Sequence, residues 1–278
     1  MIEPTAEDKP SQTAAGPRPA WVDWARVFRV VIGAAGVLAM IMLLFPGTRR
    51  PKPRPNRAGP DVRLARLAMA INDYGTLNKR YPPRAVCAGD GTPLLSWRVL
   101  VLPLLGEEKL FAEFRLNEAW DSPHNRALLS RRPDVFDHPH RFDLPPTHTA
   151  YLSLMGPGAV IHDAPAGLAL GEAPDGMVHT AILAETAKGD VPWTKPSDID
   201  IELHPRIGDP HGVSGLLGDG AFVAFLDTKS VFLPSRCPPE LLRAMVSASG
   251  GEHVPTRAEL RDAIDNWGER HATPRDAE

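Results

Sequence analysis

The feature that most constrains this chain is an apolar segment of 19 residues, from Val27 to Phe45. A helix of that length, rising about 1.5 Å per residue, matches a hydrocarbon layer about 30 Å thick. Trp21 and Trp24 precede the segment, and indole side chains favour the boundary between lipid and water. The segment therefore predicts a single transmembrane helix with the lipid bilayer as its partner; a buried core helix is the alternative.

The residues that flank this segment bear on its processing and orientation. Acidic residues precede it and no small-residue cleavage site follows it, so we expect an uncleaved anchor rather than a signal peptide. Basic residues are more frequent after the segment than before it. By the positive-inside rule, this excess places the C-terminal body in the cytoplasm. The basic residues after the segment are Arg49, Arg50, Lys52, Arg54 and Arg57.

Composition divides the rest of the chain around the anchor. Residues 1–26 are polar and predict a disordered tail, and residues 46–60 form a spacer rich in proline and arginine. Residues 61–253 suffice for one well-buried soluble domain, and residues 254–278 predict a C-terminal helix and tail. The 30 prolines favour short elements, and the net charge of −3 gives no indication of a nucleic-acid partner. Cys87 and Cys237 could form one disulfide or remain two buried thiols.

Local patterns predict both helices and strands in the soluble domain. A helix is expected to begin at Asp61, a favourable N-cap, and to end at Gly75. The segments 150–155 and 177–184 read as strands. Two further helices are expected, one opening at residues 238–240 and one after a capping box formed by Thr256 and Glu259. We expect the second of these to dock on the body, with binding to a partner as the alternative.

The clearest local prediction is a hairpin within residues 213–226. Two apolar runs flank Asp219 and Gly220, a pair that tolerates the positive φ angles of a type I′ turn. Alternation then places Phe222, Ala224 and Leu226 on one face of the second strand, and the residues between them on the other. Both faces are apolar, so we expect the hairpin to be covered on both sides.

Two sets of side chains are candidate metal ligands. His138, His140 and His148 could bind zinc, with a polar surface loop as the alternative. Asp209, Asp219 and Glu185 could gather around calcium, with simple turn chemistry as the alternative. The sequence contains no P-loop, dinucleotide fingerprint or two-histidine zincin helix. We therefore predict no catalytic residue and no cofactor.

Several blocks of sequence occur together in one order. They are residues 70–75 leading into 81–83, residues 91–100, 120–125, 149–152, 156–158, 181–185 and 192–196, and the pair Asp219 and Gly220. In this order they resemble the planctomycete family of prepilin-type membrane proteins that carry domain of unknown function 1559. The resemblance implies an α+β, type IV pilin-like domain, in which an N-terminal helix packs on a small antiparallel sheet outside the cytoplasm.

The chain departs from this family at several places, two of which bear on its expected function. Its apolar segment lacks the glutamate and the preceding cleavage site of a prepilin, so processing and fibre assembly are not expected. The family also has a histidine ten residues before the aspartate of its Asp-Gly pair, where this chain has Asp209, with His211 two residues later. We therefore expect a divergent member with an ordinary membrane anchor.

These observations predict a non-enzymatic, membrane-anchored protein with a role in envelope structure or interaction. Its expected partners are the bilayer and envelope or pilus-like proteins. Two alternatives remain: a membrane-tethered metal-dependent hydrolase that uses His138, His140 and His148, or a binding module that faces the cytoplasm.

Overall fold

A computed structural model describes residues 59–164, 167–172, 176–216, 218–248 and 254–267. The predicted membrane span from Val27 to Phe45, with Trp21 and Trp24, lies outside these residues, as does most of the spacer. Within the described ranges, none of the helices combines the length and apolar character needed to cross a membrane. The chain divides into two units, Met1–Asn56 and Arg57–Glu278, and the fold described below is that of the second.

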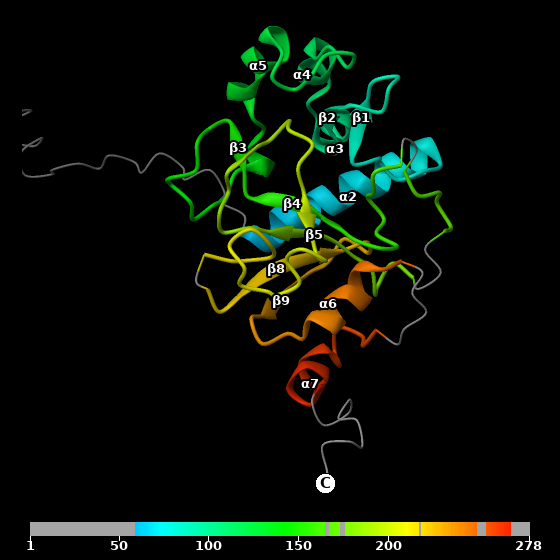
Figure 1. The fold of residues 1–278 in the computed structure, drawn as a ribbon, viewed down its shortest axis with the longest axis vertical. Helices are drawn as coiled ribbons and strands as arrows, with labels where there is room; N and C mark the ends of the chain where they lie inside the picture. The colour runs from blue at the N-terminus through cyan, green and yellow to red at the C-terminus, as the bar shows by residue number, and fades with distance from the viewer. Residues whose placement is uncertain (1–58, 165–166, 173–175, 217, 249–253, 268–278) are drawn as a thin grey trace, which may run out of the picture. The chain divides into compact units, whose positions relative to one another are not determined.

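Apart from the long helix α2, the second unit mixes short helices with short strands, as the number of prolines suggested (Figure 1). Its elements in chain order are α2 (Pro60–Asn78), β1 (Ala85–Cys87), β2 (Pro93–Ser96), α3 (Trp97–Leu100), η1 (Leu102–Leu105), α4 (Glu108–Glu113), α5 (Pro123–Leu128), η2 (Leu129–Arg131), η3 (Asp134–Phe136), β3 (His148–Thr149), β4 (Tyr151–Met155), β5 (Ala181–Glu185), β6 (Val191–Pro192), β7 (Ile199–Asp200), β8 (Gly220–Phe225), β9 (Ser230–Pro234), α6 (Pro239–Val246) and α7 (Leu260–Asp265).

A five-stranded sheet forms the centre of this unit, in the order β7-β4-β5-β8-β9. Its pairs are antiparallel except β4 with β7, which run parallel. Tyr151 on β4 lies opposite Glu185 on β5, and Phe222 on β8 lies opposite Phe232 on β9. Two small antiparallel pairs, β1 with β2 and β3 with β6, complete the strands. The predicted α+β class is therefore confirmed for the described residues.

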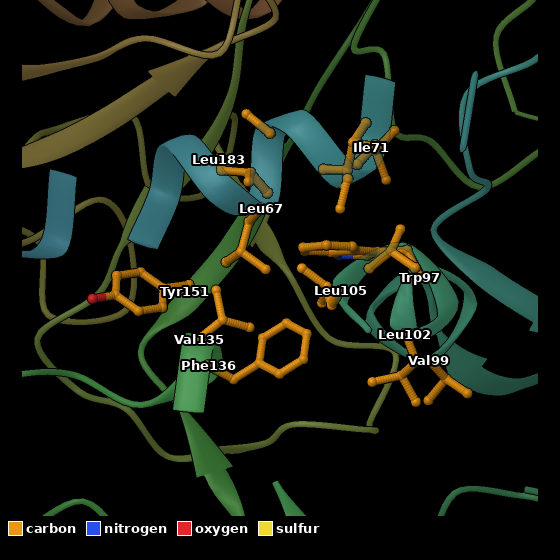
Figure 2. Close-up of a cluster of buried hydrophobic side chains, with 14 of the residues drawn as sticks. Leu67, Ile71, Trp97, Val99, Leu102, Leu105, Val135, Phe136, Tyr151 and Leu183 are labelled. Atoms are coloured by element: carbon orange, nitrogen blue, oxygen red, sulfur yellow. The ribbon is translucent and has the colours of Figure 1, made fainter. Parts of the chain in front are cut away.

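Helix α2 covers one face of the sheet and contacts β5, β8 and β9. Leu64, Leu67 and Ile71 are fully buried, as their helical spacing predicted, and they join a core that also contains Trp97 and Phe136 (Figure 2). This first core holds most of the large buried side chains contributed by α3, η1 and η3. The sheet face behind α2 is thereby closed to water.

The predicted end of α2 at Gly75 is wrong, because the helix continues to Asn78. A Cβ at Gly75 would lie 3.0 Å from the side chain of Leu170 and 3.2 Å from the ring of Tyr81. This glycine therefore permits close packing within the helix instead of ending it. The helix ends at Lys79, whose φ of 62° is left-handed.

The opposite face of the sheet is covered by α6 and α7, which share a second core with it. Leu242 of α6 and Leu260 and Ile264 of α7 are buried there. The helix expected to open at residues 238–240 is thus confirmed, and so is the docking of the last helix. Because α7 packs into this core, residues 254–267 belong to the folded body and not to a separate tail.

The predicted turn at Asp219 and Gly220 is wrong. Neither residue has a positive φ, and Gly220 instead begins strand β8. The turn that joins β8 to β9 follows Phe225 and contains Thr228, whose φ is 69°. A Cβ at Gly220 would come within 2.3 Å of the Leu233 carbonyl oxygen, so the glycine is required for close contact with β9.

The predicted alternation along β8 is confirmed although its turn was misplaced. Phe222, Ala224 and Leu226 contact the first core, whereas Ala221, Val223 and Phe225 belong to the second. The strand is therefore covered on both faces. The earlier strand predicted from residue 177 begins only at Ala181, because residues 177–179 form a turn.

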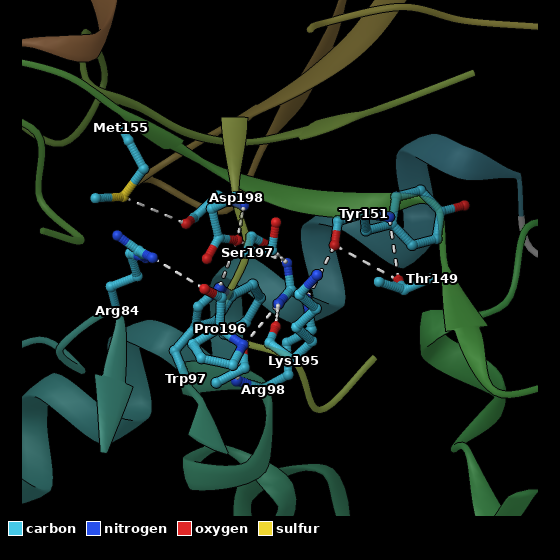
Figure 3. A network of polar contacts seen from close by, with 12 residues as sticks. Arg84, Trp97, Arg98, Thr149, Tyr151, Met155, Lys195, Pro196, Ser197 and Asp198 are labelled. Atoms are coloured by element: carbon cyan, nitrogen blue, oxygen red, sulfur yellow. Dashed lines mark hydrogen bonds and ion pairs between the residues drawn. The ribbon is translucent and has the colours of Figure 1, made fainter. Parts of the chain in front are cut away.

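A buried ion pair connects the helical layer to the sheet (Figure 3). The Arg98 guanidinium lies 2.6 Å from an Asp198 carboxylate oxygen, and both side chains are fully buried. Arg98 also donates to the carbonyl oxygen of Tyr151, and Trp97 donates to Asp198. The disulfide alternative does not occur, since Cys87 and Cys237 are free thiols.

Candidate functional site

A buried histidine and a buried glutamate from distant parts of the chain meet beside the central sheet. His138 lies in the loop after η3, and Glu185 is the last residue of β5. The His138 Nε2 is 3.1 Å from Glu185 Oε2, and the two side chains are only 3% and 6% exposed. The ring of Tyr151 stacks on His138 at 5.9 Å between centroids. Packing and hydrogen bonding thus both fix the imidazole.

The hydrogen bonds around His138 assign its tautomer. The backbone N–H of His140 donates to His138 Nδ1 at 3.3 Å, so Nδ1 is the unprotonated nitrogen. Nε2 then carries the hydrogen and donates it to Glu185. Both ring nitrogens are engaged within the protein. A metal ion or a substrate proton could reach this imidazole only if one of these bonds broke.

The second oxygen of Glu185 connects β5 to β8. The backbone N–H of Phe222 donates to Glu185 Oε1 at 2.8 Å. A Cβ at Gly215 would lie 2.9 Å from the same oxygen and 2.4 Å from the Gly220 carbonyl oxygen. Glycine at residue 215 therefore leaves room for the carboxylate, which is held by neutral donors on both of its oxygens.

This pair contributes to the lining of a pocket of about 320 Å³, named here the His138 pocket. Its lining combines two carboxylates, two imidazoles and two phenyl rings with small and aliphatic residues. Leu216 and Phe232 are 43% and 41% exposed. The lining residues are Pro60, His138, His140, Glu185, Gly215, Leu216, Asp219, Gly220, Phe222 and Phe232.

The structure separates the predicted zinc ligands. His138 and His140 line the His138 pocket, but His148 lies on β3 opposite Pro192, where its Nδ1 contacts the Thr147 hydroxyl. Burial lowers the pKa of His148, which favours its neutral form. Within the ranges that the structure describes, no three potential ligands gather closely enough to hold a metal ion.

The predicted calcium ligands are separated as well. Glu185 and Asp219 line the His138 pocket, whereas Asp209 binds His204 Nδ1 at 2.9 Å in another cluster. A hydrogen bond from the His211 backbone N–H, with a smaller contribution from His204, lowers the pKa of Asp209. Two of the three residues of each predicted set thus meet in one pocket that neither prediction described.

Sequence reasoning missed the pairing of His138 with Glu185 and the two phenylalanines. A signal was present, because Glu185 ends an otherwise apolar strand and buried carboxylates are rare without a partner. The identity of that partner could not be read from the sequence, since His138 lies 47 residues earlier in an irregular loop.

The comparisons with known proteins concern the first half of the body. Residues 57–156 match the model of a family described as a protein of unknown function (DUF1559). This stretch extends from α2 through β4 and supports the resemblance over that part of the chain. It includes His138 and His140, whereas Glu185, Asp219 and both phenylalanines lie beyond it. No curated protein and no solved structure matches the chain.

Proposed function

We propose that this protein is a single-pass membrane protein whose α+β body is a non-enzymatic, pilin-like binding domain of the cell envelope. The observation that carries the proposal is the His138 pocket, a mostly apolar recess whose lining includes the hydrogen-bonded carboxylate of Glu185. Both nitrogens of His138 and both oxygens of Glu185 already have hydrogen-bond partners. Groups so engaged are suited to shaping a binding site rather than to transferring protons.

The order of elements supports the pilin-like part of the proposal. The apolar segment from Val27 to Phe45 precedes α2, and α2 packs on a mainly antiparallel sheet. This is the plan that the family resemblance implies. Because the segment lacks a prepilin cleavage site, we propose an uncleaved anchor and a role in interaction or envelope structure without fibre assembly.

One alternative retains a specific observation in its favour. The basic residues 49–57 favour a body that faces the cytoplasm, whereas the family resemblance favours the outside. We propose the extracytoplasmic orientation. The metal-dependent hydrolase gains no support from the structure, since His148 lies on a different sheet from β5, which carries Glu185.

Membrane anchoring is tested by fractionation of the full chain. Wild-type protein should pellet with membranes and resist alkaline extraction. The double variant Ala35→Arg, Leu38→Arg should pass into the soluble fraction, because each arginine at the centre of a span costs about 2.5–3.5 kcal/mol. Leu77→Arg is the matched control, since Leu77 is 70% exposed on α2. Wild-type protein in the soluble fraction would refute the anchor.

Orientation is tested with an exposed cysteine. In a background in which Cys87 is replaced by alanine, Leu77→Cys offers a thiol at the exposed surface of α2. A membrane-impermeant maleimide should label it in intact cells if the body lies outside the cytoplasm. Labelling only after lysis would establish the cytoplasm-facing alternative.

A further inference from the structure

We propose that the His138 pocket binds an organic cation, namely a primary ammonium or guanidinium group on an apolar stem. The group would be carried either by a lysine or arginine side chain of a partner protein or by a free amine. This inference rests on the proposed function, because it names what the binding domain recognises.

The first argument is charge. The Glu185 carboxylate is almost fully buried, and both of its hydrogen-bond donors are neutral: the backbone N–H of Phe222 and the His138 Nε2–H. Asp219 contributes a second carboxylate to the lining. A buried carboxylate without a countercharge is costly, so a cation that enters this pocket gains an electrostatic partner.

No lysine or arginine occurs among the described residues that line the pocket. Three arginines lie in or contact the chain segment around His138, and each has other partners. Arg63 donates to the carbonyl oxygens of Asp134 and Asp137, and Arg132 pairs with the Asp137 carboxylate. Arg141 pairs with Asp143 and donates to the Ala187 carbonyl oxygen. Within the part of the chain that the structure describes, no lysine or arginine lines the pocket to serve as the countercharge of Glu185.

The second argument is the aromatic wall. The rings of Phe222 and Phe232 meet edge to face, with centroids 5.4 Å apart and an interplanar angle of 71°. An organic cation is attracted to the face of a phenyl ring, and the attraction increases when water is excluded. Leu216 and Phe232 are both partly exposed, so they can cover the apolar stem that follows the charged group.

The third argument is size and rigidity. A volume of about 320 Å³ exceeds that of a bare ammonium and suits a cation with a short stem. Two glycines allow the backbone to pack closely around the pocket. A side chain at Gly215 would collide with the Gly220 carbonyl oxygen, and one at Gly220 would collide with the Leu233 carbonyl oxygen of β9. A pocket that is formed before the ligand arrives loses little affinity to reorganisation.

Calorimetric titration of the full chain in a non-ionic detergent tests the proposal. The probes are n-butylammonium and Nα-acetyl-lysine methylamide, each with a neutral counterpart, n-butanol and Nα-acetyl-norleucine methylamide. Both cations should bind saturably, and the neutral counterparts should bind at least about tenfold more weakly. A preference for the capped lysine points to a partner side chain, and a preference for butylammonium points to a free amine.

Variants locate the binding. Glu185→Gln and Asp219→Asn should each weaken binding of the cations by about tenfold or more. Asp121→Asn, which removes an exposed carboxylate outside the pocket, should leave binding unchanged. Because Glu185 also holds β8, circular dichroism must show that its variant is folded. Asp219 is exposed, so its variant tests the charge argument without this complication.

Equal binding of charged and neutral probes, or undiminished binding by Asp219→Asn and folded Glu185→Gln, would overturn the proposal. Absence of saturable cation binding would also overturn it. That result in a protein that still fractionates with membranes leaves the proposed function standing. Loss of membrane association with retained cation binding would instead refute the membrane anchor and leave the cation site standing.

Discussion

At the scale of single residues, Arg98 shows how the body compensates for a charge that it buries. Its guanidinium donates to Ser96, to the carbonyl oxygen of Tyr151 and to Asp198. Burial lowers the pKa of Arg98, and the neighbouring Asp198 carboxylate acts in the opposite direction. The Asp198 oxygen in turn accepts hydrogen bonds from the Trp97 indole and the Ser153 backbone N–H. One carboxylate therefore stabilises both a charge and two neutral donors.

Replacing Asp198 with asparagine should cost about 3–5 kcal/mol of the free energy of unfolding, because a buried guanidinium then lacks its countercharge. The measurement is urea denaturation of the full chain in detergent, with an unchanged dependence on denaturant. Glu118→Gln is the control, since it removes an ion pair with Arg115 that is exposed to solvent. Equal midpoints for the two variants would contradict the assigned role of Asp198.

Cys237 makes the free energy of unfolding of the body depend on pH in the alkaline range. Burial raises the pKa of its thiol from 9.0 to about 12. The unfolded chain therefore releases this proton at lower pH than the folded chain. The stabilisation is complete below about pH 9 and should be lost as pH rises toward 12. Cys237→Val should show a shallower decline of unfolding free energy over this window, measured by urea denaturation at stepped pH. Parallel declines would disprove the effect.

Residue-scale chemistry was only partly predictable from the sequence. His138, His140, Glu185 and Asp219 were all identified as polar groups of interest, but they were assigned to two separate metal sites. Spacing along the chain groups histidines that are close in sequence, whereas the sheet groups residues that are distant. His138 pairs with Glu185 because an irregular loop passes the end of β5. No local sequence pattern predicts the path of that loop.

At the scale of elements, apolar periodicity was a good guide and turn chemistry was a poor one. The spacing of Leu64, Leu67 and Ile71 correctly predicted the buried stripe of α2, and the alternation along β8 correctly predicted its two faces. The glycines at residues 75 and 220 led to wrong predictions of a helix end and of a turn. In each case the small size of glycine serves close packing, and a sequence alone does not distinguish that use from a turn.

This use of Gly220 predicts a specific cost. Gly220→Ala should lower the free energy of unfolding by about 1–3 kcal/mol, because the new methyl group would collide with the Leu233 carbonyl oxygen and the Phe232 ring. Gly89→Ala is the matched control, since a Cβ there meets nothing within 4 Å. It should be neutral or stabilise by about 0.4–1 kcal/mol. A neutral Gly220→Ala would mean that the β8–β9 contact is looser than described.

At the scale of the whole body, the two cores share one sheet. Strand β8 contributes Ala224 to the first core and Val223 to the second, and β4 likewise contributes Tyr151 and Leu152 to opposite faces. The sequence predicted that both faces are covered but could not give the strand order, because non-adjacent strands pair through long connections. The short strand β7 pairs in parallel with β4, although β5 and β6 lie between the two in the chain. No local sequence pattern predicts this pairing.

A shared sheet should make the body unfold as one cooperative unit. Leu67→Ala in the first core and Leu242→Ala in the second should each cost about 2–5 kcal/mol, because both side chains are fully buried. The two cores pack on opposite faces of the same sheet, so a change in one should destabilise both. Trp97 and Trp193 of the first core contribute to the tryptophan emission. Leu242→Ala should therefore shift the unfolding transitions measured by tryptophan emission and by circular dichroism by the same amount. An early dichroism step with unshifted emission would instead show that α6 and α7 detach from a first core that is stable without them.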